Sequence, residues 1–139
     1  MFRNILIPLD LSTKAQITVD TAVAVAQSDS PRVTLLHVIE TIQDLAADEM
    51  EDFYRALRER ATETLAHWAD HLEQRGFQVQ SEIVVGKRAL EITHLAEELG
   101  CDLIILRSHR VDPDSPTGEI GTISHQVAVL SGCTVLMMK

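Results

Sequence analysis

The sequence predicts an α/β domain with an open, parallel sheet of five strands and four helices on its two faces. Short apolar runs alternate along the chain with longer segments whose apolar residues recur at helical spacing. Strict strand–helix alternation gives a parallel sheet, because each right-handed crossover places its helix on one face of that sheet. The 139 residues, 45% of them apolar, suffice for one core and are too few for two, so we expect a single domain over residues 1–139.

The first strand is predicted over residues 4–9 (NILIPL), an apolar run that ends at Asp10. Ser12 and Thr13 then offer N-caps for a helix. The apolar positions of this helix fall at helical spacing: Ala15, Val19, Ala22, Val23 and Ala26. Pro31 follows the helix, and residues 33–39 (VTLLHVI) are predicted to form a second buried strand.

The longest helix is predicted from Asp48 to about Gln74, after a polar segment, and it stops at Gly76. Its apolar stripe comprises Met50, Phe53, Leu57, Ala61, Leu65, Trp68 and Leu72. Apolar and polar residues alternate over residues 78–85, which predicts a third strand nearer the sheet edge. Gly86 ends this strand.

A third helix is predicted over residues 89–99, with Gly100 behind it and four inward side chains, Leu90, Leu95, Ala96 and Leu99. Residues 103–106 (LIIL) are uniformly apolar, which is typical of a strand buried on both faces. A loop, a fourth helix from about Thr122 to Leu130 and a last strand over 134–138 complete the chain. If that strand lies at an edge, its unpaired backbone groups favour a homodimer.

Composition excludes several classes of partner. The formal charge of −9 argues against nucleic acid and anionic membranes, which need a basic surface, so a small anionic ligand would require a local positive pocket. Neither a signal peptide nor an apolar run of membrane-spanning length is recognisable, and we expect a cytoplasmic protein. Cys101 and Cys133 have no metal-type spacing and are predicted to be buried free thiols.

A ligand is expected where the strands end. In open α/β sheets the crevice beyond the carboxyl ends of the strands is the default binding site. Gly121 and Thr122 would place free backbone N–H groups and a hydroxyl at the start of a helix, which suits an anion.

These residues resemble the universal stress protein family over essentially the whole chain. The likeness rests on ILIPLDLS (5–12), LLHVIE (35–40), a glycine after the third strand with a helix and GCDLIIL (100–106) behind it, and Gly-Thr, a helix and CTVLMMK (133–139). The order and spacing of these motifs are specific, although no single one is. The resemblance implies a Rossmann-like sheet of order 3-2-1-4-5, a dimer joined near the last strand, and a regulator of the stress response.

In one branch of the family, ATP binds at the strand ends. The resemblance therefore implies a site for ATP or AMP, which magnesium could accompany. Carried over position by position, the site comprises Pro8, Leu9, Asp10, Val38, Leu106, Arg107, Ser108, His109, Arg110, Gly121, Thr122, Ile123 and Ser124.

The nucleotide loop departs from the pattern of ATP-binding members, which is Gly, two residues, Gly, nine residues, then Gly with Ser or Thr. Arg107 and Arg110 stand at the first two glycine positions, and ten residues, 111–120, precede Gly121. Glycine there lets the backbone approach phosphate. The text Ser108-His109-Arg110 nevertheless resembles a subgroup of short bacterial stress proteins, some of which are reported to bind nucleotide.

Two interpretations of the arginines remain open. They could replace glycine N–H donors by guanidinium contacts to phosphate. They could instead pair within the loop and fill the pocket, an arrangement favoured by three nearby carboxylates that would also repel a triphosphate: Asp112, Asp114 and Glu119.

Other candidates also have a structural interpretation. Asp10 could face adenine or ribose, or act as a cap for the following helix. Val38 could offer backbone groups to adenine or simply pack in the core, and Thr122 fits both a binding role and an N-cap. His67 and His71 have metal-type spacing, but they flank Trp68 and lack a second cluster, which indicates a half-exposed helix face.

No motif supports catalysis, and we expect no enzyme: GxSxG, a Walker-type GK[ST] and a Cys-His pair at a strand end are all missing from the sequence. Two functions are therefore carried forward. The first is a regulator in which nucleotide binding acts as a switch. The alternative is a nucleotide-free homodimeric module that binds an unknown regulatory protein partner. Slow ATP hydrolysis is a third, weaker hypothesis, for which no base is apparent.

Overall fold

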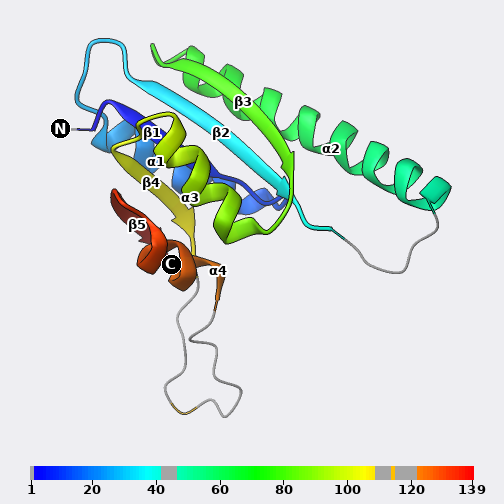
Figure 1. Cartoon of the computed structure of the whole chain (residues 1–139). Coiled ribbons are helices and arrows are strands. Elements are labelled where there is room, and N and C mark those ends of the chain that lie inside the picture. The colour runs from blue at the N-terminus through cyan, green and yellow to red at the C-terminus, as the bar shows by residue number, and fades with distance from the viewer. Residues whose placement is uncertain (1, 42–46, 109–113, 115–121) are drawn as a thin grey trace.

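A computed structural model describes residues 2–41, 47–108, 114 and 122–139 (Figure 1). Five parallel strands form one sheet in the order β3-β2-β1-β4-β5, which confirms the predicted order and the edge positions of the third and last strands. The strands and α-helices of the described residues are β1 (Asn4–Pro8), α1 (Gln16–Val25), β2 (Arg32–Ile39), α2 (Ala47–Glu73), β3 (Gln78–Val85), α3 (Arg88–Glu98), β4 (Leu103–Arg107), α4 (Ile123–Leu130) and β5 (Thr134–Met138).

The helices cover the sheet on both faces, as predicted. Ile5 and Ile7 point into a core that α1 and α2 close, whereas Leu6 points into the opposite core beneath α3 and α4. Side chains alternate between faces along a strand, so a strand that is buried on both sides needs consecutive apolar residues. This is why β1 and β4 read as uninterrupted apolar runs.

All five strands run in the same direction, so their carboxyl ends meet at one edge of the sheet. Pro8 at the end of β1 lies opposite Leu36, and Val38 lies two residues further along β2. Leu106 and Arg107 end β4 on the other side of β1. Asp10 and the start of α3 continue from strand ends at this same edge.

The turn after β1 differs in detail from the prediction. The strand ends at Pro8, and a 3-10 helix (Thr13–Ala15) precedes α1. Ser12 is an N-cap, as predicted, but of the 3-10 helix: its Oγ accepts a hydrogen bond from the Lys14 N–H at 3.3 Å. Asp10 in turn accepts the Ser12 N–H at 3.0 Å, and this fixes the path by which the chain leaves the sheet.

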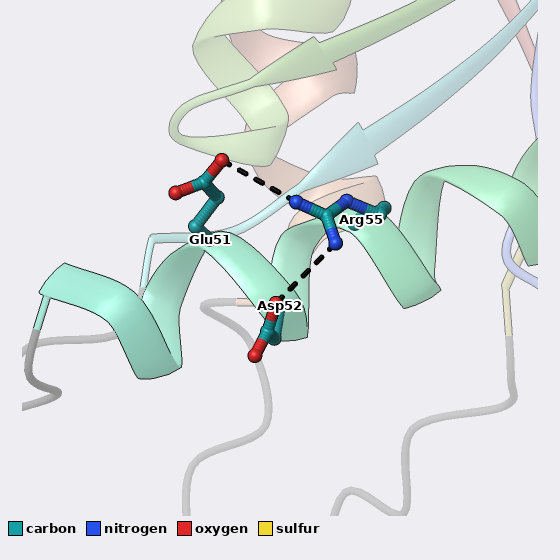
Figure 2. Close-up of polar contacts among 3 residues, drawn as sticks. All are labelled: Glu51, Asp52 and Arg55. Carbon is teal, nitrogen blue, oxygen red and sulfur yellow. Dashed lines mark hydrogen bonds and ion pairs between the residues drawn. The ribbon is translucent and has the colours of Figure 1, made fainter.

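Helix α2 is longer than the sheet it packs on, and its N-terminal half extends past the ends of β2 and β3 (Figure 1). Its predicted stripe is buried from Ala61 onward, whereas Phe53 on the projecting half is 37% exposed. There Arg55 pairs with Glu51 at 3.3 Å and with Asp52 at 3.4 Å (Figure 2). Such exposed pairs one turn apart contribute only about 0.3–0.5 kcal/mol each.

The two histidines of α2 differ from each other. His67 is exposed, as expected, whereas the His71 side chain is 28% exposed and its Nε2 lies 4.0 Å from Asp20 Oδ1 of α1. Both rings pack edge-on against Trp68, with centroids 4.8 and 5.8 Å from the indole. Among the described residues no cluster of three or more His, Cys, Asp or Glu could hold a metal ion.

One predicted core position of α3 is wrong. Leu90, expected to point inward, is 42% exposed, and the side chains that bury against the sheet are Ala89, Ile92 and Ala96. Leu95 and Leu99 pack at the border of that core. Leu90 lies about 100° around the helix from Ala89, the nearest of these buried positions, and therefore points away from the sheet.

Both cysteines are free thiols, as predicted. Cys101 is buried, and burial, followed by the charges of Cys133 and Asp102, raises its pKa from 9.0 to about 11. Cys133 is only partly buried, so the prediction of burial holds for one of the two.

Glycines end α2 and α3 because their backbones are left-handed there: φ is +89° at Gly76 and +66° at Gly100.

A Cβ at Gly100 would meet no atom within 4 Å, so a Gly100→Ala change tests conformational strain alone. We expect it to lower the free energy of unfolding by about 1–2 kcal/mol, measured by urea denaturation. Gly132 is as open and has no positive φ, so Gly132→Ala should change stability by less than about 0.5 kcal/mol; equal losses would contradict the strain argument.

Candidate functional site

A hollow of about 110 Å³ lies at the carboxyl ends of the strands. It gathers residues from β1, β2, β4 and the starts of α3 and α4, which are distant in sequence. Eight of the thirteen predicted site residues line it: Pro8, Leu9, Asp10, Val38, Leu106, Arg107, Ile123 and Ser124. The end of β4, the start of α4 and the turn after β1 therefore share one cavity.

Two further predicted residues adjoin the hollow through Ser124. The Ser124 Oγ lies 2.9 Å from the Ser108 Oγ and 3.2 Å from the Thr122 Oγ1. Thr122 is also the N-cap of α4, because its Oγ1 accepts the His125 N–H at 3.3 Å. Three hydroxyl groups thus surround the start of a helix, where backbone N–H groups favour an anion.

The remaining predicted site residues, His109, Arg110 and Gly121, lie outside the described residues. The same holds for Asp112 and Glu119, so the predicted pairing of Arg110 within the loop stays a prediction. The Arg107 side chain contacts Lys139: its Nη1 donates a hydrogen bond to the Lys139 main-chain oxygen at 3.0 Å.

Asp10 lies between positive charges. Burial by itself raises the pKa of its carboxyl group, but the hydrogen bonds from Ser12 and the charges of Arg88 and Arg107 outweigh this effect and leave the pKa below its ordinary value of 3.8. The carboxylate is therefore ionised at neutral pH and acts as a hydrogen-bond acceptor. Among the described residues that line the hollow, two guanidinium groups against one carboxylate give a positive balance, although the chain carries a charge of −9.

The backbone of Val38 is directed into the hollow. Main-chain groups of even-numbered β2 residues face β1: Arg32 N donates to Arg3 O and Leu36 O accepts from Leu9 N, both at 2.8 Å. Val38 has the same orientation, but it lies two residues beyond Leu36, which pairs with the last residue of β1. The Leu9 carbonyl, which a longer ladder would offer to Val38 N, instead accepts a hydrogen bond from His37 Nδ1 at 2.8 Å. Val38 thus presents an N–H and a C=O side by side.

Four residues that line the hollow are absent from the predicted site: Ala15, Leu36, Arg88 and Ile92. Leu36 could have been predicted from the sequence, because side chains two residues apart on a strand face the same way and Val38 was already a candidate. Arg88 and Ile92 come from α3, which begins just after the end of β3. Their signal was Gly86, which marks a strand end at the same edge of the sheet.

A second hollow of about 490 Å³ adjoins the first, and Arg88 and Ile123 line both. Lys87 adds another positive charge there, while Glu40 adds a negative one. Within the described residues, no helix combines the length and the apolar content that crossing a bilayer requires.

Comparison with solved structures supports the fold. The structure of MJ0577 superposes with a TM-score of 0.87 at 31% identity and covers 100% of this chain and 96% of that one. Two more distant structures share the fold: a universal stress protein in complex with cAMP (TM-score 0.70, 21% identity, 99% of this chain and 97% of that chain) and an Arabidopsis thaliana family protein with AMP bound (0.71, 15%, 99% and 91%).

Sequence comparison leads to the same family. Universal stress protein MJ0577 of Methanocaldococcus jannaschii is 30% identical over 156 aligned positions, which span 100% of this chain and 96% of that protein. The profile of the universal stress protein family matches residues 1–139. The chain therefore belongs to the universal stress protein family.

Proposed function

We propose that the hollow binds an adenine nucleotide, ATP or AMP, and that occupancy regulates a protein partner in the cytoplasm. The observation that carries this proposal is the pairing of two features in one cavity: the free N–H and C=O of Val38, and the hydroxyl groups at the start of α4. Relatives of the same fold with AMP or cAMP bound support it.

Each part of the nucleotide has a matching group. Adenine carries an acceptor (N1) beside a donor (N6), which complements the N–H and C=O of Val38, and apolar Leu36 and Ile92 can cover its ring. The carboxylate of Asp10 can accept hydrogen bonds from the ribose hydroxyls. Ser108, Thr122, Ser124 and Arg107 then lie toward the phosphate, with magnesium as an optional companion of a triphosphate.

The site is proposed to bind rather than to catalyse. Of the described residues that line the hollow, Asp10 is the one that could accept a proton from a nucleophile. Its lowered pKa makes it a weak base. Binding would instead act by ordering groups near β5, through which we propose that two copies form a homodimer.

Calorimetric titration of the full chain with AMP and with ATP, each with and without magnesium, tests the proposal. We expect saturable binding of at least one nucleotide. The absence of heat and of any thermal shift at millimolar nucleotide would exclude the binding function. In that case the alternative, a nucleotide-free interaction module, gains support from the projecting half of α2 with its exposed Phe53.

An Asp10→Asn change tests the ribose contact. Asparagine keeps the side-chain oxygen that accepts the Ser12 N–H, but it removes the charge. We expect AMP to bind about 10-fold more weakly, because a hydrogen bond to a charged group contributes about 1.5–3 kcal/mol. The loss should be smaller for 2′-deoxy-AMP, which lacks one ribose hydroxyl. Asp29→Asn removes the same charge from an exposed position after α1 and serves as the control; equal losses in both variants would point to a general charge effect.

A further inference from the structure

Arg88 occupies a position between the ends of β1 and β2. It is the first residue of α3, its side chain is 42% exposed, and its Nε lies 3.9 Å from Glu40 Oε1 beyond the end of β2. Its charge also lowers the pKa of Asp10 beyond the end of β1, ahead of the contribution of Arg107. The guanidinium group thus lies at the hollow, in a loose ion pair with Glu40 and close enough to Asp10 to lower the pKa of its carboxyl group.

The neighbours of Arg88 belong to the end of the hollow that suits a base. Ile92 lies one helical turn further along α3 and is buried, and Val38 and Leu36 face it from β2. The hydroxyl groups that suit phosphate lie instead at Ser108, Thr122 and Ser124, next to Arg107. The two arginines therefore serve different parts of one ligand.

From this placement we infer that Arg88 determines base specificity: its planar guanidinium stacks on the face of a purine whose edge is bound by Val38. This inference rests on the proposed function. A guanidinium has five N–H donors and no acceptor, and it stacks on aromatic rings. A purine offers a two-ring face for stacking, whereas a pyrimidine offers one ring, so Arg88 favours purines. Glu40, whose Oε1 lies 3.9 Å from the Arg88 Nε, would pair with the guanidinium beside the base.

Titration with adenosine and with AMP tests the role of Arg88, because adenosine has the base and the ribose but no phosphate. An Arg88→Met change keeps an unbranched, flexible stem and removes the charged plane. We expect it to weaken both ligands by the same factor, about 2- to 30-fold, which is the range of cation–π contacts at partly exposed sites. Arg88→Lys should not restore binding, because an ammonium group lacks the planar fork.

Lys87→Met is the matched control, since Lys87 lines only the adjoining hollow and carries the same charge. It should leave both affinities unchanged, and circular dichroism should show all variants folded. A loss for AMP with none for adenosine would assign Arg88 to phosphate and overturn the inference, as would unchanged binding in Arg88→Met. A wild-type chain that binds neither ligand would instead refute the proposed function and the role of Arg88 with it.

Discussion

A Leu6→Ala change is expected to lower the free energy of unfolding by about 2–5 kcal/mol, the range of large-to-small changes in protein cores. Leu6 is fully buried in the central strand and lies between Thr34 of β2 and Ile104 of β4. It packs in the core that α3 and α4 close, together with Leu36 and Ile92. Because its neighbours are held by a rigid sheet, they cannot collapse to fill the cavity, so the loss should lie well above that of a surface change.

The matched control is Leu90→Ala, the same chemical change on a side chain that is 42% exposed. It should change stability by less than about 0.5 kcal/mol. Both are measured by urea denaturation at one protein concentration, because self-association would add to the apparent stability. A cost at Leu90 close to that at Leu6 would show that Leu90 is buried, in the folded chain or in an assembly.

Most of the fold could be predicted from the sequence, because each element carries its own periodicity. Residues 103–106 are apolar without alternation, and only a strand covered on both faces accommodates that pattern. The order of the strands in the sheet could not be predicted from local periodicity. It was predicted from the resemblance to a family.

The orientation of α3 was less accessible. Ala89, Ile92, Ala96 and Leu99 recur at helical spacing, while Leu95 and Leu90 widen the apolar surface to either side, so the sequence leaves open which flanking leucine is buried. The choice depends on how α3 sits against β2 and α4, which is a tertiary property. In the structure Leu90 is exposed beside Leu130 of α4, and both side chains line the same two hollows.

The candidate site was predictable where it depends on strand ends. The family resemblance named Pro8, Asp10 and Val38, which agrees with the rule that parallel strands end at one edge of the sheet, and the structure brings them to one hollow. Arg88 follows less directly: Gly86 marks the end of β3 at this edge, but whether the first residue of α3 lines the hollow also depends on the angle at which that helix begins. The hydrogen bond from His37 to Leu9, which leaves the Val38 backbone free, likewise joins residues 28 positions apart and has no local signal.

The last strand decides how two copies could associate. Ser108 N donates to Met138 O at 2.7 Å, so the main chain of Met138 faces β4. Alternation then directs the N–H and C=O groups of Val135 and Met137 outward, at an edge of the sheet. Such an edge is a template for pairing with another strand. Exposed apolar side chains lie beside it, namely Met137 on β5 and Val129 and Leu130 on α4.

A Met137→Lys change is therefore expected to convert the proposed homodimer into a monomer that keeps its fold. Lysine at an edge blocks strand pairing, because its ammonium group would lose water without gaining a partner. In a twofold interface each contact occurs twice, so a cost of about 3 kcal/mol in total weakens association about 100-fold. Sedimentation velocity across a range of concentrations measures this. Leu90→Lys, at 42% exposure against 39% for Met137, controls for adding a charge to an apolar surface. If the dimer persists in Met137→Lys but dissociates in Leu90→Lys, the interface involves α3 and not β5.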